Sequence, residues 1–239
     1  MRHARWVARL ASPLLSVAVL CSAALCSAAL PASAATGVAR KPNPKDVAVL
    51  AAGVVTAADV PAGWTATKQV DTGTKKYQGI KDCRPISTAV TAARAKIPHQ
   101  LSPDFSPPGA ANTVTVVDDI VLAFKTPAAA SQFLAAFQGP TISDCLQTVL
   151  AKTTSGKAQV SVAELDDLQG LGDANVGYEA TISASDQGQS LTLVGDIVNV
   201  QVGRAIVLVS YLDDGGQTLP EGMSVVTGVV DRLRFAPGG

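Results

Sequence analysis

Residues 176–212 read VGYEATISASDQGQSLTLVGDIVNVQVGRAIVLVSYL and decide the fold. Three runs rich in Val, Ile, Thr and Tyr, at 176–184, 190–202 and 205–212, predict β-strands. The polar residues 186–189 separate the first two runs, and Gly203 lies between the last two. Both connections are typical of hairpin turns. This stretch therefore predicts an antiparallel meander of three strands.

The rest of the chain adds two strands and four helices to this meander. Apolar residues alternate over 113–125, and residues 158–165 are rich in β-branched side chains, so both segments predict strands. Helical spacing of apolar residues, with prolines at the starts and a Gly-Pro stop, predicts the helices, which lie at 85–97, at 127–138, from 143 to about 150 and at 220–233. Helices spaced along an antiparallel sheet indicate an α+β fold class.

Residues 98–111 contain four prolines. Because proline donates no backbone hydrogen bond, we expect this segment to form a loop between the first predicted helix and the strand that follows it.

The N-terminal sequence has the three parts of a secretory signal peptide. Three arginines are followed by an almost wholly apolar or small stretch, 14–30, and by small residues that suit cleavage after Ala34. We therefore predict a secreted protein in which residues 1–34 are removed. Residues 35–46 are polar and aperiodic, and we expect a flexible tether there. Residues 47–239 are expected to form one α+β domain.

The predicted mature chain is weakly acidic. The full sequence has 19 basic and 19 acidic residues, and loss of the three signal-peptide arginines leaves 16 basic residues. A chain with this charge balance lacks the excess of basic residues that is typical of nucleic-acid-binding proteins. We expect no nucleic-acid partner and, after signal cleavage, no membrane span.

Two cysteines, Cys83 and Cys145, remain after cleavage, because Cys21 and Cys26 lie in the signal peptide. Two cysteines in an exported chain favour one disulfide. It would close a loop of about 60 residues, which stabilises a fold by about 4 kcal/mol in the chain-entropy picture. The alternative is a pair of buried free thiols. A zinc site is disfavoured because it needs about four ligands and only His99 remains to help.

No motif in the sequence indicates a catalytic mechanism or a cofactor. The nucleophile elbow, the zinc-protease helix, the phosphate-binding loop and the dinucleotide fingerprint are all absent. The acidic pair Asp118-Asp119 lies on a predicted strand, where neighbouring side chains point to opposite faces. His99 is more typical of a solvated loop residue than of a general base. We therefore predict no catalytic residue, metal or cofactor.

Five side chains are candidates for lining a ligand groove, because aromatic rings with polar tips and an anion-holding guanidinium are common in binding sites. They are Trp64, Tyr77, Tyr178, Tyr211 and Arg204. Packing in the core or at its rim is the alternative for the aromatic residues, and a hairpin position is the alternative for Arg204.

Several short motifs between about residues 50 and 235 resemble those of a known family. They are Thr56 to Asp59 with Pro61 to Trp64, Phe137 to Pro140, Asp144 to Leu146, Leu171 to Asp173 and Val200 to Ala205. This layout resembles exported actinobacterial sensor-like domains related to the extracellular domain of PknH-type receptor kinases and to envelope lipoproteins. The resemblance implies an antiparallel sheet backed by helices, with a cleft for an unidentified ligand. The chain departs from it in having one available disulfide where the kinase sensors carry two.

These observations favour a non-catalytic, sensor-like or ligand-binding module of the cell envelope or the extracellular space. Its partner would be a small molecule or an envelope component. A structural or partner-docking envelope protein is the first alternative, and it predicts a contiguous apolar surface patch instead of a concave pocket. An unrecognised hydrolase is the second, and it requires a Ser, Thr or carboxylate within about 3 Å of His99.

Overall fold

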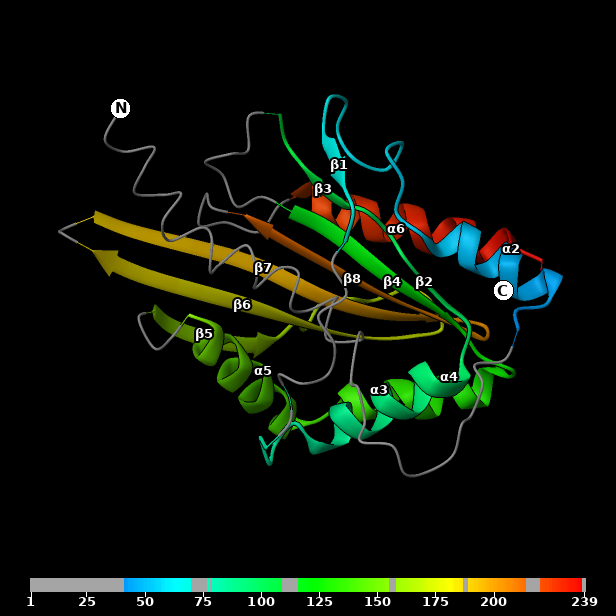
Figure 1. The fold of residues 1–239 in the computed structure, drawn as a ribbon, viewed down its shortest axis with the longest axis horizontal. Coiled ribbons are helices and arrows are strands. Elements are labelled where there is room, and N and C mark those ends of the chain that lie inside the picture. The colour runs from blue at the N-terminus through cyan, green and yellow to red at the C-terminus, as the bar shows by residue number, and fades with distance from the viewer. Residues whose placement is uncertain are drawn as a thin grey trace.

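The computed structural model describes residues 41–69, 77, 79–108, 116–154, 158–186, 189–213 and 220–237. Within these residues, an eight-stranded antiparallel sheet packs against helices on both of its faces (Figure 1). The predicted α+β fold class is confirmed. The predicted signal peptide and the first part of the predicted tether, 35–40, lie outside the described residues.

The sheet follows the order β1-β3-β4-β8-β7-β6-β5, with β2 also paired to β4. The strands are β1 (Thr65–Thr67), β2 (His99–Leu101), β3 (Asp104–Ser106), β4 (Val116–Ala123), β5 (Ala158–Glu164), β6 (Ala174–Asp186), β7 (Gln189–Val202) and β8 (Ala205–Asp213). The predicted meander forms β6, β7 and β8, which are the longest strands of the sheet. Gly203 has a φ of 53°, so the β7–β8 turn uses the left-handed conformation that glycine adopts readily.

The prediction of a loop at 98–111 is wrong for two short segments, because β2 and β3 both pair with β4. Pro103 stands between them, and it has no N–H to continue the ladder. Ser102 bridges the break. Its N–H donates to the Asp119 carbonyl at 3.1 Å, and its Oγ accepts from the Asp119 N–H at 2.8 Å. Pro103 therefore divides the pairing with β4 between two short strands rather than abolishing it.

The helices are α2 (Pro44–Gly53), α3 (Arg84–Lys96), α4 (Pro127–Leu134), α5 (Pro140–Thr153) and α6 (Pro220–Phe235), and a 3₁₀ turn, η3 (Ala135–Phe137), continues α4. Figure 1 shows α2 and α6 side by side on one face of the sheet, with α3, α4 and α5 on the other. The four predicted helices are confirmed as α3 to α6. α5 begins at Pro140, three residues before the predicted start, because proline is tolerated in a first helical turn.

Helix α2 was not expected from the apolar pattern, and it shortens the predicted tether. The Asn43 Oδ1 accepts from the Asp46 N–H at 2.9 Å, and the Asp46 carboxylate accepts from the Asn43 N–H at 3.0 Å. This capping box satisfies two N–H groups that have no partner within the helix. Residues 44–46 are therefore helical rather than flexible.

The apolar core is divided into two clusters, one on each face of the sheet. Strand β4 contributes to both, because successive side chains point to opposite faces. Ile120 and Leu122 face α3, α4 and α5, whereas Val121 and Ala123 face α2 and α6.

The predicted disulfide between Cys83 and Cys145 is confirmed. It joins the N-cap position of α3 to the inward face of α5, with a Cα–Cα distance of 4.8 Å. Both cysteines are fully buried, so the bond holds the two helices together from within the core.

Candidate functional site

A groove of about 640 Å³ runs between helices α3 and α4. Its size falls in the range of roughly 300–1,000 Å³ that is common for small-molecule sites. Its walls and floor are mainly apolar, and its lining residues are Arg84, Pro85, Thr88, Ala89, Ala92, Ala93, Lys96, Ile97, Phe124, Ala129, Gln132, Phe133 and Ala136.

Helical periodicity explains why the two walls meet. In α3, Ile86, Val90 and Ala93 are buried against the sheet. The neighbouring stripe of that helix, with Ala89 and Ala92, turns toward α4. The wall from α4 is built from Ala129, Gln132, Phe133 and Ala136, which lie at i, i+3, i+4 and i+7. Alanine side chains from both helices are too short to fill the space between them, so the groove stays open.

Aromatic rings form the floor of the groove. Phe124 follows the end of β4 and packs against Phe133, with ring centroids 5.3 Å apart, and Phe133 packs against Phe137 at 5.2 Å. The backbone under this floor is held by Arg204, whose Nη1 donates to the Phe124 carbonyl at 2.8 Å. Phe124 and Phe133 therefore give the groove an aromatic base, and Phe137 packs against Phe133 outside the lining.

A smaller pocket of about 360 Å³ adjoins the groove at the start of α3. It is lined by Tyr77, Gly79, Ile80, Lys81, Arg84, Ser87 and Thr88. Arg84 and Thr88 line both spaces, so the groove and the smaller pocket adjoin at these two side chains. The smaller pocket offers two cations and three hydroxyl-bearing side chains, in contrast to the apolar groove.

The adjacent carboxyls Asp118 and Asp119 are both fully buried in β4. Burial raises the pKa of the Asp118 carboxyl well above its usual range, and the neighbouring Asp104 carboxyl raises it further. Burial also raises the pKa of Asp119 to about 7, although the Val55 N–H donates to its Oδ1 at 3.2 Å. Neither residue lines the groove or the smaller pocket. Asp119 instead ties the segment after α2 to the sheet.

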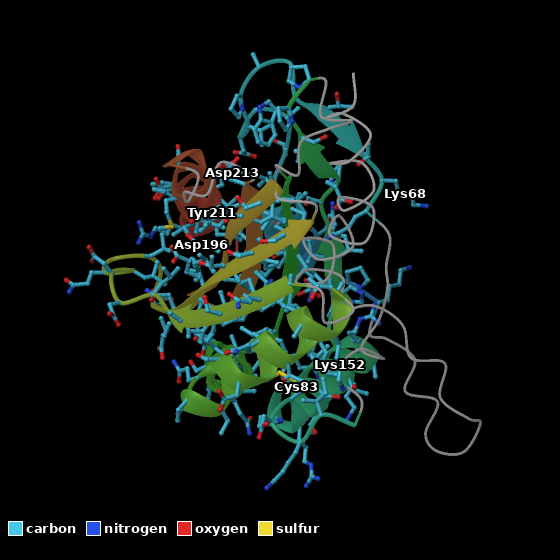
Figure 2. The ribbon with its side chains drawn as sticks, turned by 90° about the vertical axis from the view of Figure 1, so that its left-hand side faces the viewer. Lys68, Cys83, Lys152, Asp196, Tyr211 and Asp213 are labelled. Atoms are coloured by element: carbon cyan, nitrogen blue, oxygen red, sulfur yellow. A yellow bond between two sulfur atoms is a disulfide. The ribbon has the colours of Figure 1, made fainter. Side chains whose placement is uncertain are left out.

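Another buried carboxyl, that of Asp196, lies on the α6 side of the sheet. The Tyr211 hydroxyl donates to the Asp196 Oδ2 at 2.6 Å, and Figure 2 shows the two side chains next to each other, far from Cys83. Burial raises the pKa of Asp196 to about 6. Burial and the bond to Asp196 also raise the pKa of Tyr211 above its usual range. Near pH 6 the Asp196 carboxyl is therefore about half protonated, whereas the Tyr211 hydroxyl stays neutral.

Three of the five predicted groove residues belong to the core instead. Tyr178 is 1% exposed and its hydroxyl donates to the Phe137 carbonyl at 2.6 Å. Tyr211 is equally buried on the opposite face, and Trp64 packs half-buried against the α2–α6 cluster. The prediction that these aromatic residues line one groove does not match their positions. The hydroxyl groups of Tyr178 and Tyr211 find acceptors inside the protein, so both rings can fill core space.

The other two predicted residues have separate positions. Tyr77 lines the smaller pocket. Arg204 lies in the β7–β8 turn, and its Nη1 donates to Asp46 at 2.7 Å as well as to the Phe124 carbonyl. Arg204 therefore supports the groove floor from below and does not line the groove.

His99 lies at the start of β2. Its Nδ1 is 3.0 Å from the Ile97 carbonyl, and this nitrogen must carry the proton because a carbonyl only accepts. No Ser, Thr or carboxylate partner of His99 is found in the described part of the chain. The described residues also contain no group of three His, Cys, Asp or Glu side chains suited to a metal ion. None of their helices has the length and apolar character needed to cross a membrane.

Comparison with known proteins gave one resemblance. No family model matches the chain, and no curated protein matches it. Among solved structures, the extracellular domain of PknH from Mycobacterium tuberculosis is similar, with 15% identity and a TM-score of 0.43 over 65% of this chain and 76% of that chain. At this identity and TM-score, the likeness is a loose resemblance of fold and says nothing about ligands.

Proposed function

We propose that this chain is a non-catalytic binding module of the cell envelope or the extracellular space, and that the α3–α4 groove holds its ligand. The groove itself is the observation that carries this proposal. It has mainly apolar walls and an aromatic base of Phe124 and Phe133, and the Cys83–Cys145 bond holds the start of α3, which forms one wall. Preformed apolar concavities of this size are typical small-molecule sites.

A concave site favours ligand binding over docking of a protein partner on a flat apolar patch. Among the described residues, the large hydrophobic side chains that are exposed are Val47 and Phe235. Each is a single side chain of the kind that soluble proteins expose routinely. The groove, in contrast, gathers apolar atoms from two helices and a strand end.

The test is binding of an uncharged fluorescent probe, phenylnaphthylamine, to the mature protein. Ala92 lies in the groove wall and is exposed, so Ala92→Trp fills the groove without entering the core. We expect this variant to lower the probe affinity by about tenfold or more, which corresponds to about 1.4 kcal/mol. Ala95→Trp is the matched control, because Ala95 is exposed on the same helix outside the groove. Equal effects of the two variants would contradict the proposal.

Export is part of the same proposal. Residues 1–34 have the features of a signal peptide, and residues 47–239 are proposed to be the single domain that functions after export. Determination of the N-terminal sequence of the protein from culture medium tests this. A start within a residue or two of Ala35 supports it, and a chain that keeps Met1 and stays with the cells contradicts it.

A further inference from the structure

We infer that the smaller pocket is an anion subsite of the groove, so that the ligand is an amphiphile with an apolar body and one anionic head group. This inference rests on the proposed function, because the groove must hold the apolar body. The head group would be a phosphate or a carboxylate, and it would lie at the N-terminal end of α3.

The first support is the contact between the two spaces. Arg84 and Thr88 line both, so the two spaces adjoin at these side chains and are close enough for one molecule to occupy both. The groove then continues along α3 to Lys96, about 18 Å from Arg84 at 1.5 Å per helical residue. A ligand in this site therefore has an elongated apolar part.

The second support is the chemistry of the smaller pocket. Lys81 and Arg84 supply positive charge, and Ser87, Thr88 and Tyr77 carry hydroxyl groups. Guanidinium groups bind phosphate and carboxylate through two parallel hydrogen bonds. Within the part of the chain that the structure describes, neither Lys81 nor Arg84 forms an ion pair. Asp82 is adjacent in sequence, but it does not line the pocket.

The third support is the orientation of α3. Its N-terminal end lies beside the pocket, its first turn contains no acidic residue, and Cys83 at the N-cap position makes no side-chain hydrogen bond to the helix. The helix dipole therefore adds positive potential where Lys81 and Arg84 lie. The Cys83–Cys145 bond fixes this end of the helix, so the cations keep their place at the groove entrance.

The test compares three amphiphiles with the same chain below their micelle concentrations: dodecyl phosphate, dodecanol and dodecylamine. The affinity of each compound is measured by its displacement of phenylnaphthylamine from the mature protein. Inorganic phosphate is titrated in the same way, without an amphiphile. We expect dodecyl phosphate to bind about tenfold or more tightly than dodecanol, and dodecylamine to bind most weakly. Added salt should reduce the preference for the phosphate.

Variants locate the head group. The double variant Lys81→Gln/Arg84→Gln should lower the ratio of dodecyl phosphate to dodecanol affinity by about tenfold, whereas Lys96→Gln, at the other end of the groove, should change that ratio by less than about twofold. Circular dichroism and thermal unfolding verify that each variant is folded. An unchanged ratio in the double variant, or a larger effect from Lys96→Gln, would overturn the anion subsite.

Three further outcomes distinguish the ways in which the inference and the proposed function could fail. If inorganic phosphate binds as tightly as dodecyl phosphate, the pocket is a site for a free anion, and the amphiphile is ruled out. If dodecanol and dodecyl phosphate bind equally and Ala92→Trp weakens both, the groove is a binding site but the anion subsite is wrong. If none of the amphiphiles binds, the proposed function itself fails.

Discussion

The two faces of the sheet are held together by different means. On the α2–α6 face, arginines make ion pairs and backbone contacts across the helices: Arg232 bonds to Asp59 and to the carbonyls of Ala52 and Val54. On the α3–α5 face, one disulfide joins two helices, and an open groove lies between α3 and α4. The first face is closed by many polar contacts, and the second leaves room for a ligand.

Small residues have opposite effects on the two faces. A Cβ at Gly53 would lie 2.7 Å from Val121, so glycine there brings α2 into close contact with the sheet. The alanines of α3 and α4 face each other instead and leave a space. Small side chains therefore close one face and open the other, depending on whether they point to the sheet or to a neighbouring helix.

The largest expected effect is on the α3–α5 face, from removal of the disulfide. The double variant Cys83→Ala/Cys145→Ala should lower the free energy of unfolding by about 4 kcal/mol, because the bond closes a loop between residues 62 apart. Urea unfolding measures this value, and phenylnaphthylamine affinity should fall with it. The reduced parent protein is the control and should behave like the variant. A loss below about 1 kcal/mol would mean that the disulfide is not the main source of stability on this face.

The next effect is on the α2–α6 face. Arg232→Ala leaves the buried Asp59 carboxylate without its ion pair, and we expect a loss of about 2 kcal/mol, reduced from a fully buried pair because Arg232 is 36% exposed. Arg234→Ala is the matched control, since its pair with Asp231 is exposed and should contribute less than about 1 kcal/mol. Chemical unfolding of both variants gives the difference, and similar losses would argue against a special role for Arg232.

Substitutions of two glycines of α6, Gly222 and Gly228, should change the stability in opposite directions. A Cβ at Gly222 would overlap the Tyr211 ring, which its hydroxyl bond to Asp196 holds in place. Gly222→Ala should therefore cost about 2 kcal/mol. The nearest atom to a Cβ at Gly228 is 3.7 Å away, so Gly228→Ala should stabilise the helix by about 0.5–1 kcal/mol. Thermal unfolding of the two variants should thus give shifts of opposite sign, and shifts of the same sign would refute the close packing.

The smallest expected effect is a pH dependence of the α2 contact. The pKa of Asp119 is about 7 in the folded state, above its ordinary value of 3.8, so the folded protein binds more protons between these values. Stability should therefore fall as pH rises from about 4 to 7 and level off above it. Asp119→Asn keeps an acceptor for the Val55 N–H and should reduce the fall between pH 5 and pH 7 by about 1 kcal/mol. Parallel curves for parent and variant would show that Asp119 does not cause the fall.

Local patterns predicted the elements that local physics determines. Alternation and turn residues gave β6, β7 and β8, and apolar spacing gave α3 to α6. Helix α2 carries an equally local signal, since Asn43, Pro44 and Asp46 form the start of a capped helix. The two short strands at 99–106 depend instead on pairing with β4, a contact between segments that composition alone does not reveal.

The candidate site was harder to predict for a related reason. Aromatic residues with polar tips suggested a groove, but Tyr178 and Tyr211 find buried acceptors that only the folded chain brings near. The groove comes from alanines at helical spacing, which as a pattern also fits close helix packing. Only the relative placement of α3 and α4 distinguishes the two outcomes. Of the residues predicted to line a groove, only Tyr77 lines the smaller pocket.

The disulfide also sets a boundary along the chain. Every residue that lines the groove lies between Cys83 and Cys145, whereas β5 to β8 and both helices of the closed face lie outside that interval. If the proposed function holds, the apolar body of the ligand would contact one covalently bounded segment, whereas the smaller pocket also uses Tyr77, Gly79, Ile80 and Lys81, just before that segment. Mutation or recombination within that segment would then change the preference for the apolar body and leave β5 to β8, α2 and α6 unaltered. A library confined to that interval is accordingly the starting point for altering the proposed apolar groove, and a library that also covers residues 77–81 would alter the proposed anion subsite.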